Sequence, residues 1–311
     1  MPSLLAPLRR RLLNALTGLD DGSAAWISEI GEGDDEGYFG PESAAWEVHA
    51  AMPTLVAGIR ALLMQTLHPG AMAGVHDWSR YKSDPLGRLT GTIRWIVAVT
   101  FGSKEMAQRE SARVARFHDR VNGAYPAAAG EVEYSAHDPE LLRWVHLAFT
   151  EAFLGCHETW GAPIPGGADG YVREWARAGE LVGARDLPTT RAELRAQLDA
   201  FRMAGVLRRD ERVDEAVRFI RTPPLPGTGP AYSFLFAGAV ASIPVEYRRL
   251  LGLRRAWWPA VTATRIVLFV AGRALAGSPS DPSRSPSARE LATARVARLR
   301  AAVPGNQASG G

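Results

Sequence analysis

Apolar residues recur at helical spacing along almost the whole chain, and this pattern constrains the fold more than any other feature of the sequence. Neither a repeated period nor a convincing strand alternation interrupts it. The pattern predicts helices over residues 41–67, 86–101, 104–122, 139–157, 168–182, 190–204, 209–220, 231–251 and 255–276. We therefore expect an all-α fold, a single multi-helix globular domain.

Local start and stop signals agree with this division. Asp138 precedes a proline at the first helical position, and Thr190 precedes Glu193 at the spacing of a capping box. Glycines fall where three of the helices should stop, at Gly102, Gly123 and Gly252.

Composition narrows the class of protein. The chain has 311 residues, 46% of them hydrophobic, which is enough for a sizeable core. Cys156 is the only cysteine, so an intrachain disulfide and a cysteine metal cluster are both excluded. A reducing compartment suits such a chain, and we expect it in the cytoplasm.

The net charge of +3 is confined to the C-terminal tail, which alone carries five arginines against Asp281 and Glu290. The rest of the chain is balanced, whereas a nucleic-acid groove needs basic residues concentrated on one face. We therefore expect no nucleic-acid partner.

The two ends of the chain differ from its body. Residues 4–19 resemble a short amphipathic helix, which we expect to dock on the body rather than lie on a membrane. Ser and Pro dominate residues 277–287, which predicts a flexible linker before a basic helix over residues 288–302 and a disordered end. The expected organisation is an N-terminal helix and loop (1–40), a helical domain (41–277) and a tail (278–311).

Polar residues on apolar helices mark a candidate site. Arg88 and Thr92 lie one helical turn apart and should face the same way. His118 shares a helical stripe with Val114 and Val121, which directs its ring toward a core or pocket. Position alone also allows a core histidine bonded to a carbonyl, and an isolated pair like Arg88 and Thr92 is a weak signal.

Four segments together resemble one known family. They are residues 65–69 (QTLHP), 74–79 (GVHDWS), 84–92 (DPLGRLTGT) and 117–123 (FHDRVNG). The chain is thereby similar to the haem-dependent oxygenases that include latex-clearing protein (rubber oxygenase) and MpaB. The resemblance implies a helical fold that encloses haem b, with His118 as the proximal iron ligand. It also implies that Arg88 supplies positive charge near a propionate or bound oxygen and that Thr92 forms a hydrogen bond close by.

Other histidines have two interpretations each. His68, before a proline, either caps carbonyls or lines the pocket. His146 follows a family-like pattern beside the pocket, where it serves in packing or supports the cofactor indirectly. His76 and Asp77 could join a proton relay, although helix capping by Asp77 or Ser79 is the simpler expectation. Glu47 with His49 is expected on a solvated helix face.

Departures from the family limit the function. Rubber-cleaving relatives have a lysine where this chain has Gly91, and their catalytic glutamate has no equivalent that we can place. We expect a haem b-dependent oxygenase that uses dioxygen on a small hydrophobic molecule, of which an isoprenoid chain is one example. The alternatives are a haem-binding sensor or carrier without turnover, and a cofactor-free helical protein. A non-haem iron or zinc site is also conceivable, but the compact ligand spacing is absent.

Overall fold

The central element of the fold is α8 (Pro139–Trp160), the longest helix among the described residues. α4 (Thr54–Gln65), α9 (Gly167–Leu181) and α10 (Arg191–Met203) pack along it. Trp46, Trp144 and Trp175 are fully buried in the core that these helices share. Large aromatic side chains therefore fill the space between the packed helices at the centre of the molecule.

The computed structural model describes residues 6–17, 24–127, 130–224, 229–254, 256–257, 259–276 and 285–302. The remaining helices are α1 (Ala6–Thr17), α2 (Ala25–Ser28), a 3-10 turn η1 (Glu29–Gly31), α3 (Ala44–Ala50), α5 (Pro69–Trp78), α6 (Pro85–Phe101), α7 (Lys104–His118), α11 (Glu211–Arg221), α12 (Gly229–Ser242), α13 (Val245–Leu250), α14 (Ala260–Ala276) and α15 (Ala288–Ala302). One two-stranded hairpin, β1 (Asn122–Ala127) and β2 (Gly130–Ser135), accompanies them. The expected all-α class is confirmed, with this hairpin as its exception. No described helix combines the length and apolar character needed to cross a bilayer.

The predicted capping signals operate as expected. The Asp138 carboxylate accepts a hydrogen bond of 2.8 Å from the Glu140 N–H at the start of α8. At α10 the Thr190 hydroxyl accepts from the Glu193 N–H at 3.2 Å. The Glu193 carboxylate in turn accepts from the Thr189 N–H at 2.7 Å, so the two side chains satisfy donors at this helix end.

Two expected helices are each divided by a proline. The helix expected over residues 41–67 stops at Ala50 and resumes at Thr54, with Pro53 between them. The helix expected over residues 231–251 breaks in the same way at Pro244. In both cases the proline removes a backbone donor and its ring clashes with the preceding turn, so the apolar pattern continues while the helix does not.

The segment after α7 was predicted wrongly. The helix expected over residues 104–122 ends at His118, and Gly123 lies in β1 instead of terminating the helix. β1 and β2 pair antiparallel, from Asn122 opposite Ser135 to Ala127 opposite Gly130. The two strands are too short to show a clear alternation of apolar and polar residues, and most of their side chains are exposed.

α5 was also missed, although Pro69 stands at its first position, where proline favours a helix start.

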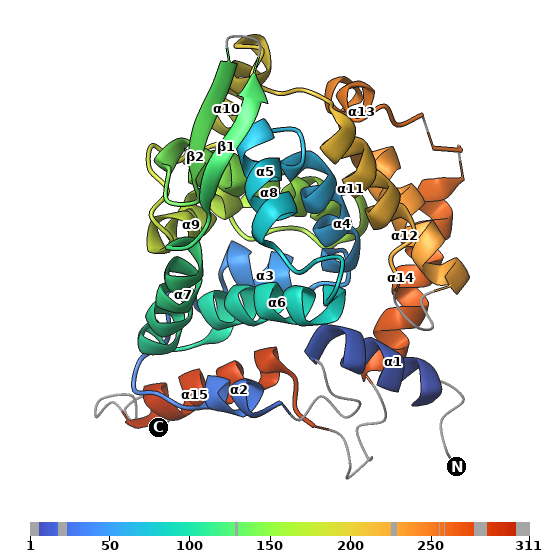
Figure 1. Ribbon diagram of the computed structural model, residues 1–311. Helices are drawn as coiled ribbons and strands as arrows, with labels where there is room; N and C mark the ends of the chain where they lie inside the picture. Colours follow the sequence, from blue (N-terminus) through green and yellow to red (C-terminus); the bar gives the residue numbers. More distant parts are fainter. Residues whose placement is uncertain are drawn as a thin grey trace.

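Both ends of the described chain dock on the body. α1 packs against α6 and α14, as expected for this helix. The basic helix predicted over residues 288–302 is present as α15, and it packs against η1, α2 and α6. Figure 1 shows α6 lying between α5 above it and α15 with α1 below it. Most of the predicted linker and the predicted disordered end lie outside the described residues.

Arg295 holds α15 to the body. Its side chain is fully buried, and it donates hydrogen bonds to the backbone carbonyls of Ile30 and Glu32 and to that of Phe101 at the end of α6. A guanidinium can satisfy carbonyls on two sides at once because its donors are fixed in a planar fork. The carbonyl of Phe101, one of those that a helix leaves unsatisfied at its C-terminus, thereby gains a partner from the C-terminal helix.

We expect Arg295→Lys to lower the free energy of unfolding by about 3 kcal/mol, because one ammonium cannot reach carbonyls on both sides and the charge stays buried. Urea denaturation followed by circular dichroism measures this. Arg298→Lys is the matched control, since Arg298 on the same helix is exposed and bonds one carbonyl, that of Gly31. Equal effects of the two substitutions would contradict a special role for Arg295.

Candidate functional site

The candidate site is built on the hairpin of α6 and α7. Asp84 begins α6 by accepting a hydrogen bond of 2.9 Å from the Gly87 N–H. Ser103 begins α7 by accepting from the Met106 N–H at 3.2 Å. With Gly102 as the break between them, the two helices run antiparallel and pack side by side.

A buried carboxylate joins the two helices. Glu110 of α7 is 1% exposed and accepts hydrogen bonds from Arg94 of α6 at 2.6 Å and from Arg113 at 2.7 Å. Burial alone would raise the pKa of Glu110, but the hydrogen bonds from these two arginines outweigh it and hold this pKa below its usual value. Arg113 also donates to the Gly91 carbonyl at 3.1 Å, so the side chains of α7 hold one defined turn of α6.

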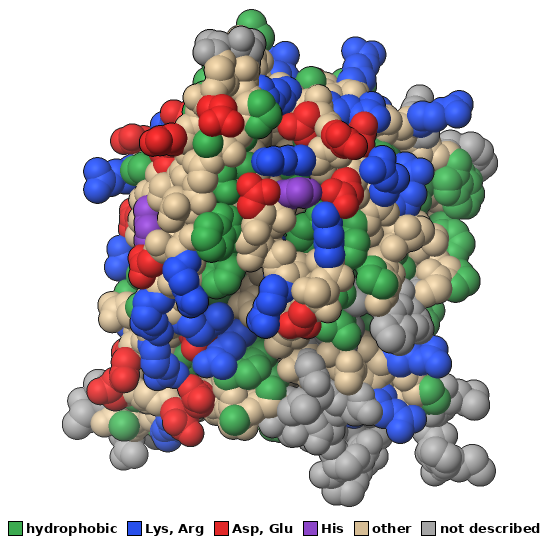
Figure 2. Space-filling model, in the orientation of Figure 1, with side chains coloured by type: hydrophobic (Ala, Val, Ile, Leu, Met, Phe, Trp, Pro, Cys, Tyr) green, Lys and Arg blue, Asp and Glu red, His purple; other side chains and the backbone are tan. Residues whose placement is uncertain are grey.

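This register places the predicted residues at one end of the hairpin. Gly91 of α6 lies opposite Arg113 of α7. Because the helices are antiparallel, Arg88, three residues before Gly91, lies opposite residue 116, three residues after Arg113. Arg88 is therefore within one helical turn of His118. The expected shared orientation of Arg88 and Thr92 is present, and the Thr92 hydroxyl donates to the Arg88 carbonyl at 3.2 Å. Figure 2 shows the surface hollowed between α5, α6 and α7 on this face of the molecule.

His118 lies at the rim of this region rather than deep within a core. It is the last residue of α7 and is half-buried, Phe117 beside it is 52% exposed, and Val121 lies beyond the end of the helix. The expected apolar stripe is therefore incomplete, because the helix stops before Val121. Burial lowers the pKa of His118, with a further contribution from His137, whose ring centre lies 6.0 Å away. His118 is neutral at neutral pH, which is the state that binds a metal.

The two ring nitrogens of His118 have different surroundings. Nδ1 is enclosed and has no hydrogen-bond partner. Nε2 is not enclosed, and no described residue forms a hydrogen bond with it. The structure therefore leaves an unbonded imidazole nitrogen at a half-buried position.

Arg88 is a cation without a partner. Its side chain is half-buried, and it makes no hydrogen bond or ion pair with any described residue. Burial lowers the pKa of Arg88, while the nearby Tyr81 opposes this shift. A guanidinium remains charged in either case, and taking it out of water costs free energy unless an anion compensates. The position is suited to an anionic group.

His68 and His146 lie in the core, away from the α6–α7 hairpin. The expected capping of carbonyls by His68 is wrong, because neither of its ring nitrogens has a hydrogen-bond partner. Both of its ring nitrogens are enclosed without partners, and the ring packs against Trp144 and Phe201. His146 of α8 contacts the Thr150 hydroxyl at 3.3 Å under α9. Burial lowers the pKa of His68 and of His146 to about 4 in each case.

His49 was assigned wrongly to a solvated face. Aromatic rings of α8 and α9 surround it, with the Trp175 ring centre at 4.0 Å and the Phe153 ring centre at 5.0 Å. Its Nε2 lies 3.2 Å from the Tyr171 hydroxyl, and its Nδ1 is enclosed without a partner. Burial, together with His157, lowers the pKa of His49 to about 3. The short spacing to Glu47 had concealed this environment, which depends on helices far along the chain.

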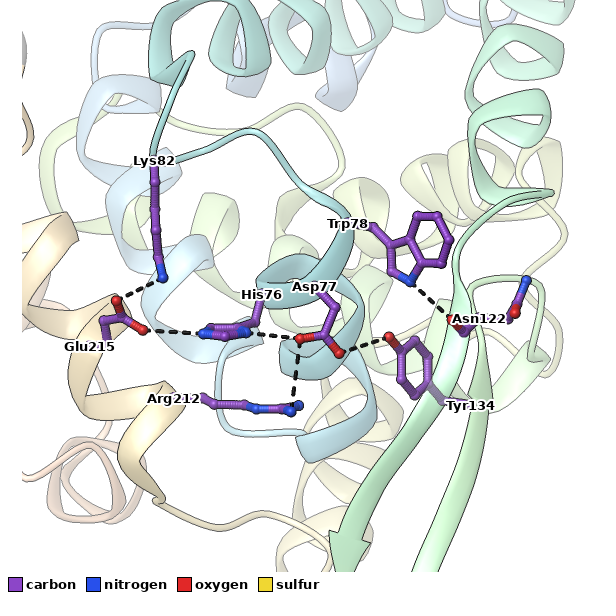
Figure 3. A network of polar contacts seen from close by, with 8 residues as sticks. All are labelled: His76, Asp77, Trp78, Lys82, Asn122, Tyr134, Arg212 and Glu215. Atoms are coloured by element: carbon purple, nitrogen blue, oxygen red, sulfur yellow. Dashed lines mark hydrogen bonds and ion pairs between the residues drawn. The ribbon is translucent and has the colours of Figure 1, made fainter.

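A polar network that includes His76 and Asp77 lies beside α5. His76 links Asp77, at 2.9 Å, to Glu215 of α11, at 3.2 Å, and Lys82 reaches the same glutamate at 2.7 Å. Figure 3 shows that Tyr134 of β2 completes the network, donating to Asp77 at 3.3 Å. Asp77 also lies 3.8 Å from Arg212 of α11, so it joins α5, β2 and α11 and caps no helix. The link to Glu215 spans 139 positions of the chain, which no local pattern reveals.

Comparison with known proteins defines the family. The family described as the ER-bound oxygenase mpaB/B'/rubber oxygenase catalytic domain matches residues 46–277. This match covers well over half of the chain, and the chain belongs to that family of oxygenases. No curated protein and no solved structure shows significant similarity to it. Among the described residues, no group of three or more His, Cys, Asp or Glu side chains is placed so that it could hold a metal ion.

We expect Glu110→Ala to lower the free energy of unfolding by about 2–3 kcal/mol, because it leaves two arginines at the helix contact without their carboxylate. The value is below that of a fully buried pair because both arginines are partly exposed. Urea denaturation measures it. Glu105→Ala on the exposed first turn of the same helix is the control and should cost less than about 1 kcal/mol. A similar cost for both variants would contradict the role of Glu110 as a clamp, meaning the carboxylate that joins Arg94 of α6 to Arg113 of α7.

The buried histidines predict a pH dependence of stability. A folded pKa of about 4, below the unfolded value of about 6.5, means that His68 and His146 each stabilise the fold fully above pH 6.5 and lose this contribution as the pH falls toward 4. At pH 5 each loss is about 2 kcal/mol relative to pH 7. His68→Leu should recover about that amount in urea midpoints compared at the two pH values, whereas the exposed His137→Ala should not. An unchanged pH slope in His68→Leu would show that His68 is accessible to protons in the folded state.

Proposed function

We propose that this protein is a haem b-dependent oxygenase that uses dioxygen to oxidise a small hydrophobic molecule. Membership of the oxygenase family supports the reaction class. The observation that carries the cofactor assignment concerns the seven histidines, all of which lie among the described residues. His118 is the one whose Nε2 is neither enclosed nor bonded.

The other six histidines are less suited to bind iron. The Nε2 atoms of His49, His76, His137, His146 and His157 each contact a hydroxyl, carboxylate or carbonyl oxygen, and His68 is enclosed on both nitrogens. A haem ligand must offer a free, neutral imidazole nitrogen to the iron. His118 meets that requirement, and its lowered pKa keeps it neutral.

Other residues of α6 fit the remaining parts of a haem group. The unpaired guanidinium of Arg88 would pair with a haem propionate, which supplies the anion that this half-buried cation lacks. Thr92, one turn away, offers a hydroxyl whose present bond to the Arg88 carbonyl is long and replaceable. A Cβ atom at Gly91 would meet nothing within 4 Å, so there is open space where rubber-cleaving relatives carry a lysine.

In this proposal the haem iron supplies dioxygen binding and the oxidising power, and the protein supplies the ligand, the charge and the apolar surroundings. His118 holds the cofactor, Arg88 neutralises and orients it, and the Glu110 clamp keeps these two side chains at a fixed separation. Phe117, next to His118, is 52% exposed and offers apolar contact surface to a hydrophobic substrate. Small hydrophobic ligands bind best in such mostly apolar surroundings.

The proposal predicts that protein expressed with ample haem shows a Soret band that His118→Ala loses. His137→Ala is the matched control, since its ring lies 6.0 Å from that of His118 but its Nε2 is already bonded to Asp119 at 2.7 Å. We expect this control to keep its haem. Arg88→Gln should retain much of the haem and lose oxygen consumption, measured with a reductant and an alkene such as squalene. A wild-type protein without a Soret band, or a His118→Ala variant with unchanged haem content, would contradict the assignment.

A further inference from the structure

The outer face of α14 is apolar and exposed. Ile266 is 61% exposed, Phe269 is 69% exposed and Val270 is 39% exposed. These positions are three and four residues apart, so they form one stripe on the helix surface. Single exposed apolar residues are ordinary, but a contiguous stripe of large ones marks a surface that contacts something other than water.

The packing of α14 keeps this stripe outward. Its buried face is made mostly of small residues, Ala260, Thr264, Ala271 and Ala274. Thr264 donates to the Phe234 carbonyl of α12 at 2.9 Å, and a Cβ atom at Gly238 would come within 2.3 Å of the Thr264 hydroxyl oxygen. This close approach leaves no room for large side chains between α12 and α14. The helix therefore cannot rotate to bury Phe269 without separating from its neighbour.

Positive charge lies close to the stripe. Arg265 and Arg273 lie on the same exposed side of α14, and one guanidinium nitrogen of Arg265 donates to the Thr159 carbonyl at 2.9 Å. α1, which packs on α14, carries the exposed Arg10 and Arg11. No Asp or Glu is present in α1, α12 or α14. Figure 2 shows green apolar side chains along the edge formed by α12 and α14, with blue basic groups nearby.

We propose that this face of α14, with the flanking arginines, binds the surface of an anionic lipid membrane. The bilayer interface accepts the apolar stripe, and lipid phosphates pair with the arginines. A second copy of the chain suits the face poorly, because a symmetric contact would bring the same arginines together without a carboxylate on these helices to compensate. A membrane-associated enzyme would also take an apolar substrate from the phase in which that substrate dissolves.

Vesicle flotation of the full-length protein tests this proposal. We expect the protein to float at low salt with vesicles of phosphatidylglycerol and phosphatidylcholine in equal parts, and to stay behind with vesicles of phosphatidylcholine alone. Replacing both Ile266 and Phe269 by Ser should weaken binding by about tenfold or more, because the apolar contact is lost. Arg265→Gln and Arg273→Gln should each weaken it by about fivefold, and added salt should do the same.

The control variant replaces Met203 and Val245 by Ser, since these are also exposed apolar side chains but lie on other helices. Its binding should equal that of the wild type, and circular dichroism should show all variants folded. The proposal is overturned by a wild type that does not float with the anionic vesicles, or by equal binding of the Ile266 and Phe269 variant. Light scattering that shows a dimer lost in that variant, without vesicle binding, would assign the face to a second copy instead. None of these results depends on haem content.

Discussion

The contact between Glu110 and its two arginines is the interaction on which the candidate site depends. α6 and α7 carry Arg88 and His118 on separate helices, and nothing in either helix alone sets their separation. A buried carboxylate that accepts from both helices fixes their axial register, and the further bond from Arg113 to the Gly91 carbonyl locates one turn of α6. Leucine and valine side chains could have packed the same contact, but apolar surfaces slide more easily than charge-assisted hydrogen bonds with fixed geometry.

α6 is also held at its end. Arg295 reaches the Phe101 carbonyl from a helix that lies 194 positions further along the chain. The helix that carries Arg88 is thus fixed in its middle by α7 and at its C-terminus by α15. Its first turns, by contrast, have only partly buried side chains. A rigid end and a less enclosed beginning are what a helix needs if it supports a site to which a ligand must gain access.

Sequence patterns predicted the helices well where the signal was local. The capping side chains of Asp138 and Thr190 and the apolar period of α6 were sufficient, because each acts within one or two turns. The breaks at Pro53 and Pro244 could have been found from the prolines themselves, had the apolar period not been given more weight. The hairpin after His118 could not, because six-residue strands that are mostly exposed carry too little alternation.

For the candidate site, the resemblance to a family suggested Arg88, Thr92 and His118, and the register of α6 against α7 brings Arg88 within one helical turn of His118. The environments of the other histidines depended on contacts across the chain and were less predictable. His49 looked solvated beside Glu47, yet Trp175 and Phe153 enclose it from helices more than 100 positions away. Asp77 was expected to cap a helix, yet with His76 it lies in a network that Glu215 and Tyr134 complete.

The distribution of paired and unpaired charged side chains gives the strongest argument about what the α6–α7 hairpin binds. Around it, Arg94 and Arg113 share Glu110, and Arg109 pairs with Glu29 at 2.5 Å. Arg88 has no such carboxylate among the described residues, although burial already disfavours its charge. Folding does not retain an uncompensated, partly desolvated cation for its own stability, since an apolar side chain there would cost less. The free-energy cost of burying this cation is offset only if an anion from outside the chain pairs with it. In the proposed function, a haem propionate would be that anion, and His118 on the neighbouring helix would be the residue that holds the iron.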